Sequence, residues 1–236
     1  MEKRPQALLL KYPGTNCDAE TARALEVVGF DATVVPIAAA RKEHFSDAQL
    51  VVFPGGFSYG DYIMAGRLAQ LETESRLGDA VKEFHAGGGY LLGICNGFQI
   101  LTKLGILPGG SLVANTNGRF VCRWVGLNKT ADSPFLTNLP DEFELPVAHA
   151  EGRFVGDEGA AEAHLKDGHA AVTYDPNFNG SQSQIAGLQD STKRAFGLMP
   201  HPERFIFRHH HYDPDWNGDS DWGWGHHFFQ SIRDAV

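Results

Sequence analysis

The segment Gly93-Ile94-Cys95-Asn96-Gly97 joins the apolar run Tyr90-Leu91-Leu92 to a helix-like stretch at residues 98–104. A strand that turns sharply into a helix lifts the residue at the turn out of the sheet, and flanking glycines leave room for this crowded backbone. Cys95 would then lie at a helix N-terminus, where the helix dipole and free N–H groups favour a thiolate. The pattern predicts a nucleophile elbow, and the alternative is a small, buried structural cysteine.

The residues before this elbow alternate between two patterns. Residues 7–10, 32–35 and 50–53 form short apolar runs, and the spacing of apolar residues predicts helices at 18–28 and 68–85. Such alternation is typical of parallel strands joined by crossover helices. Loops at the carboxyl ends of these strands are then expected to carry the chemistry.

Beyond residue 105 the chain changes to short strand-like pieces separated by Gly, Asn and Pro turns. We interpret them as an antiparallel extension of one α/β domain. The pieces of this extension include residues 112–114, 120–124 and 143–145. One further short strand is expected at 170–174, and a hairpin of buried strands at 185–188 and 195–199. The expected domain covers residues 1–236, with a core at about 6–204 and a His-, Asp- and Trp-rich extension at 205–236.

Composition narrows the class of protein. The 236 residues are 42% hydrophobic, which indicates a folded protein, and the formal net charge of −9 argues against binding to nucleic acid or membrane surfaces. Three cysteines without paired spacing favour a reducing compartment. The N-terminus lacks the apolar core of a signal peptide, so we expect a cytoplasmic protein.

A glycine-containing loop, Pro54-Gly55-Gly56-Phe57-Ser58-Tyr59-Gly60-Asp61, follows the third expected strand. Backbone N–H groups freed by Gly55 and Gly56 are expected to point toward a nucleophile on the next strand. One donor from Gly56 and one from Asn96 would form an oxyanion hole. The alternative is a flexible turn.

A cysteine nucleophile needs a base, and the base needs an acceptor that fixes its tautomer. His201 and Glu203 supply both types within Pro200-His201-Pro202-Glu203. In an extended segment, side chains at i and i+2 project to one face, so Glu203 would hold His201 toward Cys95. The alternative is a solvated turn after a strand.

These residues carry a family resemblance. The segments 93–99 and 200–203 resemble the signature of class I (triad) glutamine amidotransferases. Three further motifs, residues 13–18, 54–61 and 197–204, resemble more narrowly the family of glutaminase subunits of phosphoribosylformylglycinamidine synthase. The resemblance implies a flavodoxin-like fold with a mostly parallel central sheet flanked by helices, and it leaves out only the C-terminal tail.

The resemblance also implies a mechanism. Cys95 attacks the carboxamide of glutamine, and N–H groups near Gly56 and Asn96 bind the oxyanion. His201 protonates the departing ammonia and then activates water against the thioester, while Glu203 orients His201. Further contacts with glutamine are implied for Gly55, Phe57, Gln99 and Asn117, and roles at a partner interface for His149 and Glu151. For Gln99 the alternative is a surface amide, and for His149 and Glu151 it is an ordinary surface loop.

The resemblance implies a division of labour in de novo purine (IMP) biosynthesis. This subunit would release ammonia, and a synthetase subunit, often with a small third subunit, would use it. We find no Gly-x-x-x-x-Gly-Lys-Ser/Thr motif, so we expect ATP and Mg on the synthetase and no cofactor here. The alternatives are a glutaminase serving another synthetase, a stand-alone cysteine hydrolase, and a non-catalytic assembly subunit with a vestigial triad.

The remaining chemistry-bearing residues are assigned structural roles. Cys17 and Cys122 are expected to be structural thiols. The histidines of the tail are adjacent or mixed with Trp and Pro, unlike the spacing of zinc ligands, so no metal site is expected. The tail is expected to be a surface extension or a partner contact.

Overall fold

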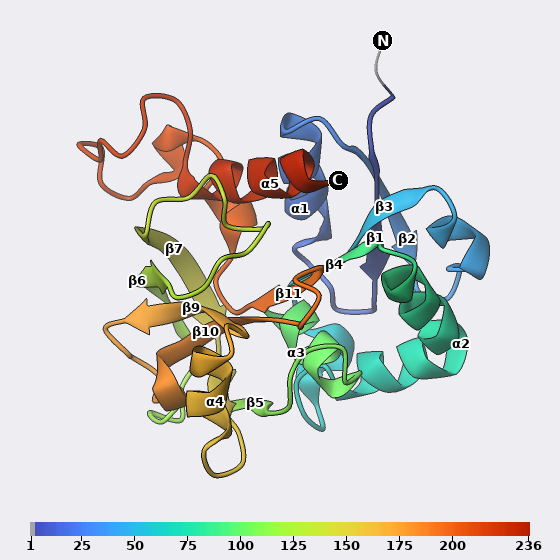
Figure 1. The fold of residues 1–236 in the computed structure, drawn as a ribbon, viewed down its shortest axis with the longest axis horizontal. Helices are drawn as coiled ribbons and strands as arrows, with labels where there is room; N and C mark the ends of the chain where they lie inside the picture. Colours follow the sequence, from blue (N-terminus) through green and yellow to red (C-terminus); the bar gives the residue numbers. More distant parts are fainter. Residues whose placement is uncertain (1–2) are drawn as a thin grey trace.

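A nine-stranded sheet forms the centre of the computed structural model, which describes residues 3–236 (Figure 1). The apolar runs of the sequence supply its buried strands. In spatial order the strands are β2 (Asp31–Pro36), β1 (Gln6–Lys11), β3 (Ala48–Phe53), β4 (Tyr90–Ile94), β11 (Ala195–Leu198), β10 (Ile185–Gln189), β9 (Ala170–Asp175), β6 (Val121–Lys129) and β7 (Glu142–His149).

The strands from β2 to β11 run parallel to their neighbours, and those from β11 to β7 pair antiparallel. The expected fold class, a parallel α/β sheet with an antiparallel extension, is therefore confirmed. Strand β4 lies between β3 and β11, and Gly93 pairs with Phe53 on one side and Gly197 on the other. The carboxyl ends of β1, β3, β4 and β11 thus meet at one edge of the sheet.

Helices cover both faces of the parallel part (Figure 1). Helices α1 (Asp18–Val27) and α5 (Trp224–Ala235) contact each other on one face, and α2 (Arg67–Ala86) and α3 (Asn96–Lys103) contact each other on the other. Opposite faces follow from right-handed crossovers, because the β1–α1–β2 and β3–α2–β4 units advance in opposite directions along the sheet. None of the helices in residues 3–236 is long and apolar enough to cross a bilayer.

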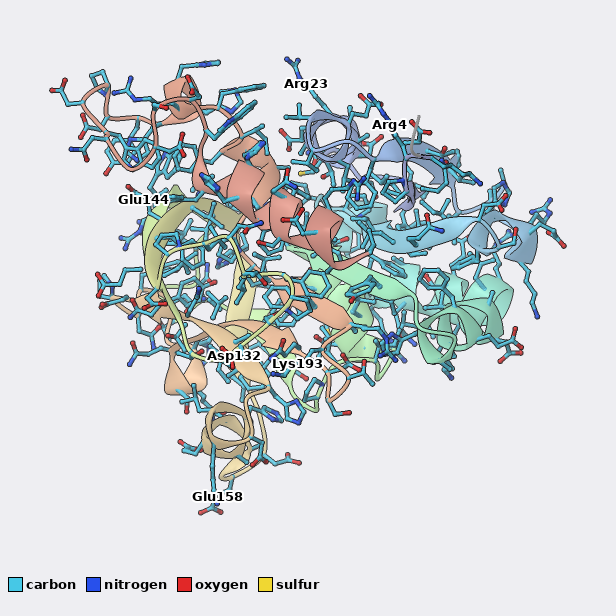
Figure 2. The ribbon with its side chains drawn as sticks, turned by 45° about the horizontal axis from the view of Figure 1, so that its top comes forward. Arg4, Arg23, Asp132, Glu144, Glu158 and Lys193 are labelled. Carbon is cyan, nitrogen blue, oxygen red and sulfur yellow. The ribbon has the colours of Figure 1, made fainter. Side chains whose placement is uncertain are left out.

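Smaller elements complete the antiparallel part. Strands β5 (Ser111–Ala114) and β8 (Glu151–Val155) form a separate two-stranded sheet, and α4 (Ala160–Lys166) precedes β9. Figure 2 shows Glu158 at the far end of this part, while Arg4 and Arg23 extend from the opposite side of the molecule. Short 3₁₀ turns are η1 (Lys42–Phe45), η2 (Ser58–Asp61), η3 (Gln182–Gln184), η4 (Pro202–Arg204) and η5 (Arg208–His210).

The C-terminal tail differs from the surface extension expected from its composition. Helix α5 places Phe228, Phe229 and Ile232 in the hydrophobic core, each with no exposed side-chain surface. Its first turn also packs closely on η4, because a Cβ on Gly225 would overlap the carbonyl oxygen of Pro202. The end of the chain therefore supports the turn that carries His201.

The elbow around Cys95 depends on close contact between backbones. A Cβ on Gly97 would overlap the carbonyl oxygen of Phe53 at the end of β3, and one on Gly93 would lie 2.6 Å from the carbonyl oxygen of Gly97. Helix α3 can begin directly against the sheet only because both positions lack side chains. The flanking glycines of the elbow are therefore required by packing.

This close contact predicts the effect of adding one methyl group. Gly97→Ala should lower the free energy of unfolding by about 3 kcal/mol, the upper part of the usual range for overpacking. Gly109→Ala is the matched control, since a Cβ there meets nothing within 4 Å, and its effect should stay within about 0.5 kcal/mol. Denaturant unfolding measures both changes, and equal stabilities of the two variants would contradict the packing argument.

Candidate active site

Cys95 lies at the turn between β4 and α3 in a strained backbone conformation. Its φ is 52° and its ψ is −105°, a region that side-chain-bearing residues rarely occupy. The Cys95 N–H donates a hydrogen bond to the carbonyl oxygen of Leu198 at 2.8 Å, which fixes the turn to β11. The side chain is 5% exposed and its Sγ lies 3.8 Å from the carbonyl oxygen of Ala148. This geometry agrees with the predicted nucleophile elbow.

His201 and Glu203 form a buried pair beyond the carboxyl end of β11. The His201 ring is joined through Nδ1 to Oε1 of Glu203 at 2.6 Å, and the two residues are 1% and 3% exposed. The backbone N–H of His201 donates a hydrogen bond to the carbonyl oxygen of Pro146 at 2.8 Å. The contact is the one predicted, but its geometry differs. Pro202 starts the 3₁₀ turn η4, so a tight turn, and not an extended segment, brings the two side chains together.

The surroundings of His201 favour its charged form. Burial opposes that charge, but the negative groups of Glu203 and Cys95 outweigh the burial and raise the pKa of His201 well above its ordinary value. A cationic imidazole beside a cysteine sulfur favours the nucleophilic thiolate. Among the described residues, Nε2 of His201 and Oε2 of Glu203 have no hydrogen-bond partner. The contact between Nδ1 and Oε1 therefore fixes the pair, while Nε2 of His201 and Oε2 of Glu203 can each bind a further group.

A pocket of about 120 Å³ lies in front of Cys95. Gly56 lines it together with Cys95, and the φ of Gly56, +146°, is one that favours glycine. Asn96 is the first residue of α3, and its N–H has no acceptor within the helix because it lies in the first turn. The two predicted oxyanion donors thus come from a loop and a helix start that adjoin Cys95.

The residues assigned to glutamine contacts have different positions. Gln99 and Phe57 line the pocket. Gln99 is 3% exposed, and its amide accepts from Asn96 Nδ2 at 2.9 Å and donates to the carbonyl oxygen of Glu151 at 2.5 Å, so it is not a surface amide. Gly55 instead gives space to His201, because a Cβ there would lie 2.9 Å from Cε1 of that ring. Asn117 lies on an exposed turn outside the pocket lining.

His149 and Glu151, assigned to a partner interface, both line the pocket. His149 is only 3% exposed, so other residues of this chain cover it and it does not lie on a surface loop, which was the alternative. Burial, aided by the charge of His201, lowers the pKa of His149 to about 3, so this ring is neutral near neutral pH. Glu151 accepts a hydrogen bond from the Ala65 N–H at 3.1 Å and so fixes the loop before α2.

Two residues near the site were not found by sequence reasoning. Asp61 lines the pocket and accepts from Asn96 Nδ2 at 3.2 Å, and burial raises its pKa. Cys17, expected to be structural, lies beside His201 and Glu203, with one donor atom of each of the three residues within 4.8 Å of the others. The signals for Cys17 were its place in a loop after a parallel strand and in the family motif at residues 13–18.

Comparisons with known proteins agree with this geometry. The family of CobB/CobQ-like glutamine amidotransferase domains matches residues 4–234. The phosphoribosylformylglycinamidine synthase subunit PurQ of Dehalococcoides mccartyi is 41% identical over 231 residues, which cover 89% of each protein. The subunit PurQ of Thermotoga maritima is 36% identical over 206 residues, 86% of this chain and 89% of that one.

A solved structure shows the same likeness. A chain of the PurLQS structure from Thermotoga maritima matches with a TM-score of 0.82 and 33% identity, over 99% of both chains. A glutamine amidotransferase from the same organism, at 21% identity and a TM-score of 0.56, shares the fold. Its match covers 86% of this chain and 77% of that one.

The His201 charge predicts the reactivity of Cys95. In His201→Gln, alkylation of Cys95 by iodoacetamide near neutral pH should slow by about 10-fold or more, because the variant lacks the cation that favours the thiolate. The exposed Cys122 provides a control in the same molecule, and its alkylation rate should not change. Peptide mass spectrometry separates the two sites. An unchanged rate at Cys95 would show that His201 does not activate it.

Proposed function

We propose that this chain, which belongs to the family of CobB/CobQ-like glutamine amidotransferase domains, is the glutaminase subunit of phosphoribosylformylglycinamidine synthase. It is a glutamine amidotransferase that hydrolyses glutamine and supplies ammonia for purine biosynthesis. The observation that carries the proposal is Cys95, which lines the pocket on a strained elbow. The buried pair of His201 and Glu203 lies close enough for the charge of Cys95 to raise the pKa of His201.

The first half of the reaction forms a thioester. The Cys95 thiolate attacks the carboxamide carbon of glutamine, and the N–H groups of Gly56 and Asn96 stabilise the resulting oxyanion. When the intermediate collapses, the C–N bond breaks and His201 gives its proton to the departing nitrogen. Ammonia leaves, and the glutamyl group remains on sulfur.

The second half restores the enzyme. Neutral His201 takes a proton from water, and the hydroxide attacks the thioester carbon. The C–S bond then breaks, glutamate leaves, and the thiolate and the imidazolium are formed again. Glu203 stabilises the imidazolium in both halves through its contact with Nδ1. Because His201 is cationic at rest, the proton that ammonia needs is already in place.

A partner is required because ammonia released into water would be protonated and lost. Five exposed apolar side chains support a docking surface at the mouth of the pocket. They are Phe57, Tyr62, Ile63, Met64 and Phe120, each between 43% and 90% exposed. We call this set the mouth patch. Phe57 belongs to both the patch and the pocket lining, and its ring centroid lies 6.0 Å from that of Phe120.

We assign the mouth patch to the synthetase subunit, with ammonia passing from the pocket into that partner. The presence of a matching chain in the PurLQS structure supports an assembly of this kind. ATP and Mg are expected on the synthetase, and a small third subunit completes the complex. The cytoplasm is the expected location, since a reducing compartment keeps the Cys95 thiol free for catalysis.

The catalytic assignment is tested with the complete complex. Cys95→Ala should lower glutamine-dependent synthesis by about 10⁴-fold or more, because Cys95 is the one cysteine among the residues that line the pocket. Synthesis from added ammonium salts should stay near the wild-type rate, since the synthetase is intact. Equal loss of both activities would refute the division of labour, and full glutamine-dependent activity would exclude Cys95 as the nucleophile.

The docking surface is tested by introducing one charge. Ile63→Asp should weaken binding to the synthetase by roughly 10-fold or more, because it places a carboxylate in an apolar contact. Tyr212→Ser is the control: Tyr212 is also exposed, but it packs against Trp124 and not at the pocket. Sedimentation or calorimetry with the purified synthetase gives both affinities. Unchanged binding by Ile63→Asp would show that the interface lies elsewhere on the protein.

A further inference from the structure

Cys17 adjoins the pair of His201 and Glu203 and is not one of the residues that line the pocket. It is the N-cap residue of α1, follows β1, and is 1% exposed. The missing side chain of Gly55 leaves the space in which it meets His201. A Cβ on Gly55 would lie 2.9 Å from Cε1 of His201 and 3.2 Å from Sγ of Cys17. Cys17 has no role in the proposed reaction.

The donor set is one that binds metal ions. A thiol, an imidazole and a carboxylate, all buried, place one donor atom each within 4.8 Å of the other two. Thiolate and imidazole select soft or borderline divalent ions such as Zn²⁺, and three protein ligands with one open position are common in zinc sites. Nε2 of His201 and Oε2 of Glu203 also have no hydrogen-bond partner among residues 3–236. Oε2 of Glu203 therefore has a lone pair available to an ion, and Nε2 of His201 offers one once the ring has lost its proton.

We propose that Cys17, His201 and Glu203 form a site for a thiophilic divalent cation, with Zn²⁺ as the best fit, that inhibits the enzyme by occupying its catalytic histidine. The inhibition rests on the proposed glutaminase function, whereas the binding does not. On binding, the Cys17 S–H bond breaks and the cationic His201 ring loses one N–H proton. Both protons pass to solvent, and the thiolate and the neutral imidazole bond to the metal. A metal-bound His201 can no longer carry a proton to ammonia or take one from water.

The geometry requires small movements. Zn–S and Zn–N bonds of about 2.3 and 2.0 Å place tetrahedral ligands roughly 3.5 Å apart, so the widest pair must close by about 1 Å. Arg204 must also withdraw, because its guanidinium lies 3.2 Å from Sγ of Cys17 and repels a cation. Its side chain is 33% exposed and pairs with the half-exposed Glu20, so it can move into solvent.

Cobalt tests the binding without reference to activity. Co²⁺ added to the metal-free protein should give the near-ultraviolet charge-transfer absorption of a thiolate–Co²⁺ bond. Cys17→Ser should remove this absorption, whereas Cys95→Ser and Cys122→Ser should keep it. Circular dichroism checks folding, and Cys17→Ala provides a second variant at the same position. Absence of the absorption in the wild type, its persistence in both Cys17 variants, or its loss in Cys95→Ser would overturn the site.

Inhibition is measured on the complex with its synthetase. Zn²⁺ should inhibit glutamine hydrolysis reversibly, with recovery on adding a chelator. The Zn²⁺ concentration for half-inhibition, relative to each variant's own uninhibited rate, should rise at least 10-fold in Cys17→Ser and not in Cys122→Ser. Equal sensitivity of these two variants would refute the inhibitory role. If the wild-type complex lacks glutaminase activity but the cobalt absorption follows Cys17, the proposed function fails and the metal site stands.

Discussion

The structure depends on a close approach of backbones at the start of α3. Gly97 lies against the carbonyl oxygen of Phe53, and this contact allows the helix to begin directly above β3 and β4. The chain must therefore reverse within one residue, and Cys95 takes a left-handed conformation to do so. Strain of this kind persists only where the surroundings fix it. The hydrogen bond from Cys95 to Leu198 and the tight fit of the glycines supply that fixation.

The parallel order of four strands then determines what surrounds the cysteine. Each of β1, β3, β4 and β11 delivers one loop to the same edge of the sheet, and adjacent strands deliver adjacent loops. These loops carry Cys17, Gly56, Cys95 and His201 respectively. The oxyanion loop lies on one side of the nucleophile because β3 neighbours β4, and the histidine lies on the other because β11 does. The arrangement of the site is a consequence of strand order.

Sequence patterns predicted those elements whose signal is local. Buried parallel strands are short apolar runs, and the motifs at Cys95 and His201 sit where such runs end, so the fold and the triad could be predicted. Helix α5 was missed because His and Trp obscure its helical stripe of Phe228, Phe229 and Ile232. The turn geometry at Pro202 was misjudged because proline suits both an extended segment and the first turn of a helix. The approach of Cys17 to His201 joins loops distant in sequence and has no local signature.

The C-terminal helix α5 lies outside the sequence motifs of the site but supports the turn that follows His201. The buried Glu203 would cost free energy without a positive partner, and His201 supplies that partner only while η4 keeps its shape. Helix α5 restricts this turn through Gly225, which lies against the carbonyl oxygen of Pro202. The backbone N–H of Gly225 also donates a hydrogen bond to the carbonyl oxygen of Phe205 at 2.9 Å. The anchors of α5 are apolar core residues, so core packing and the alignment of the histidine are physically linked. Loosening the tail would therefore disturb the ion pair before it unfolded the sheet, since the sheet is held by its own strand pairing.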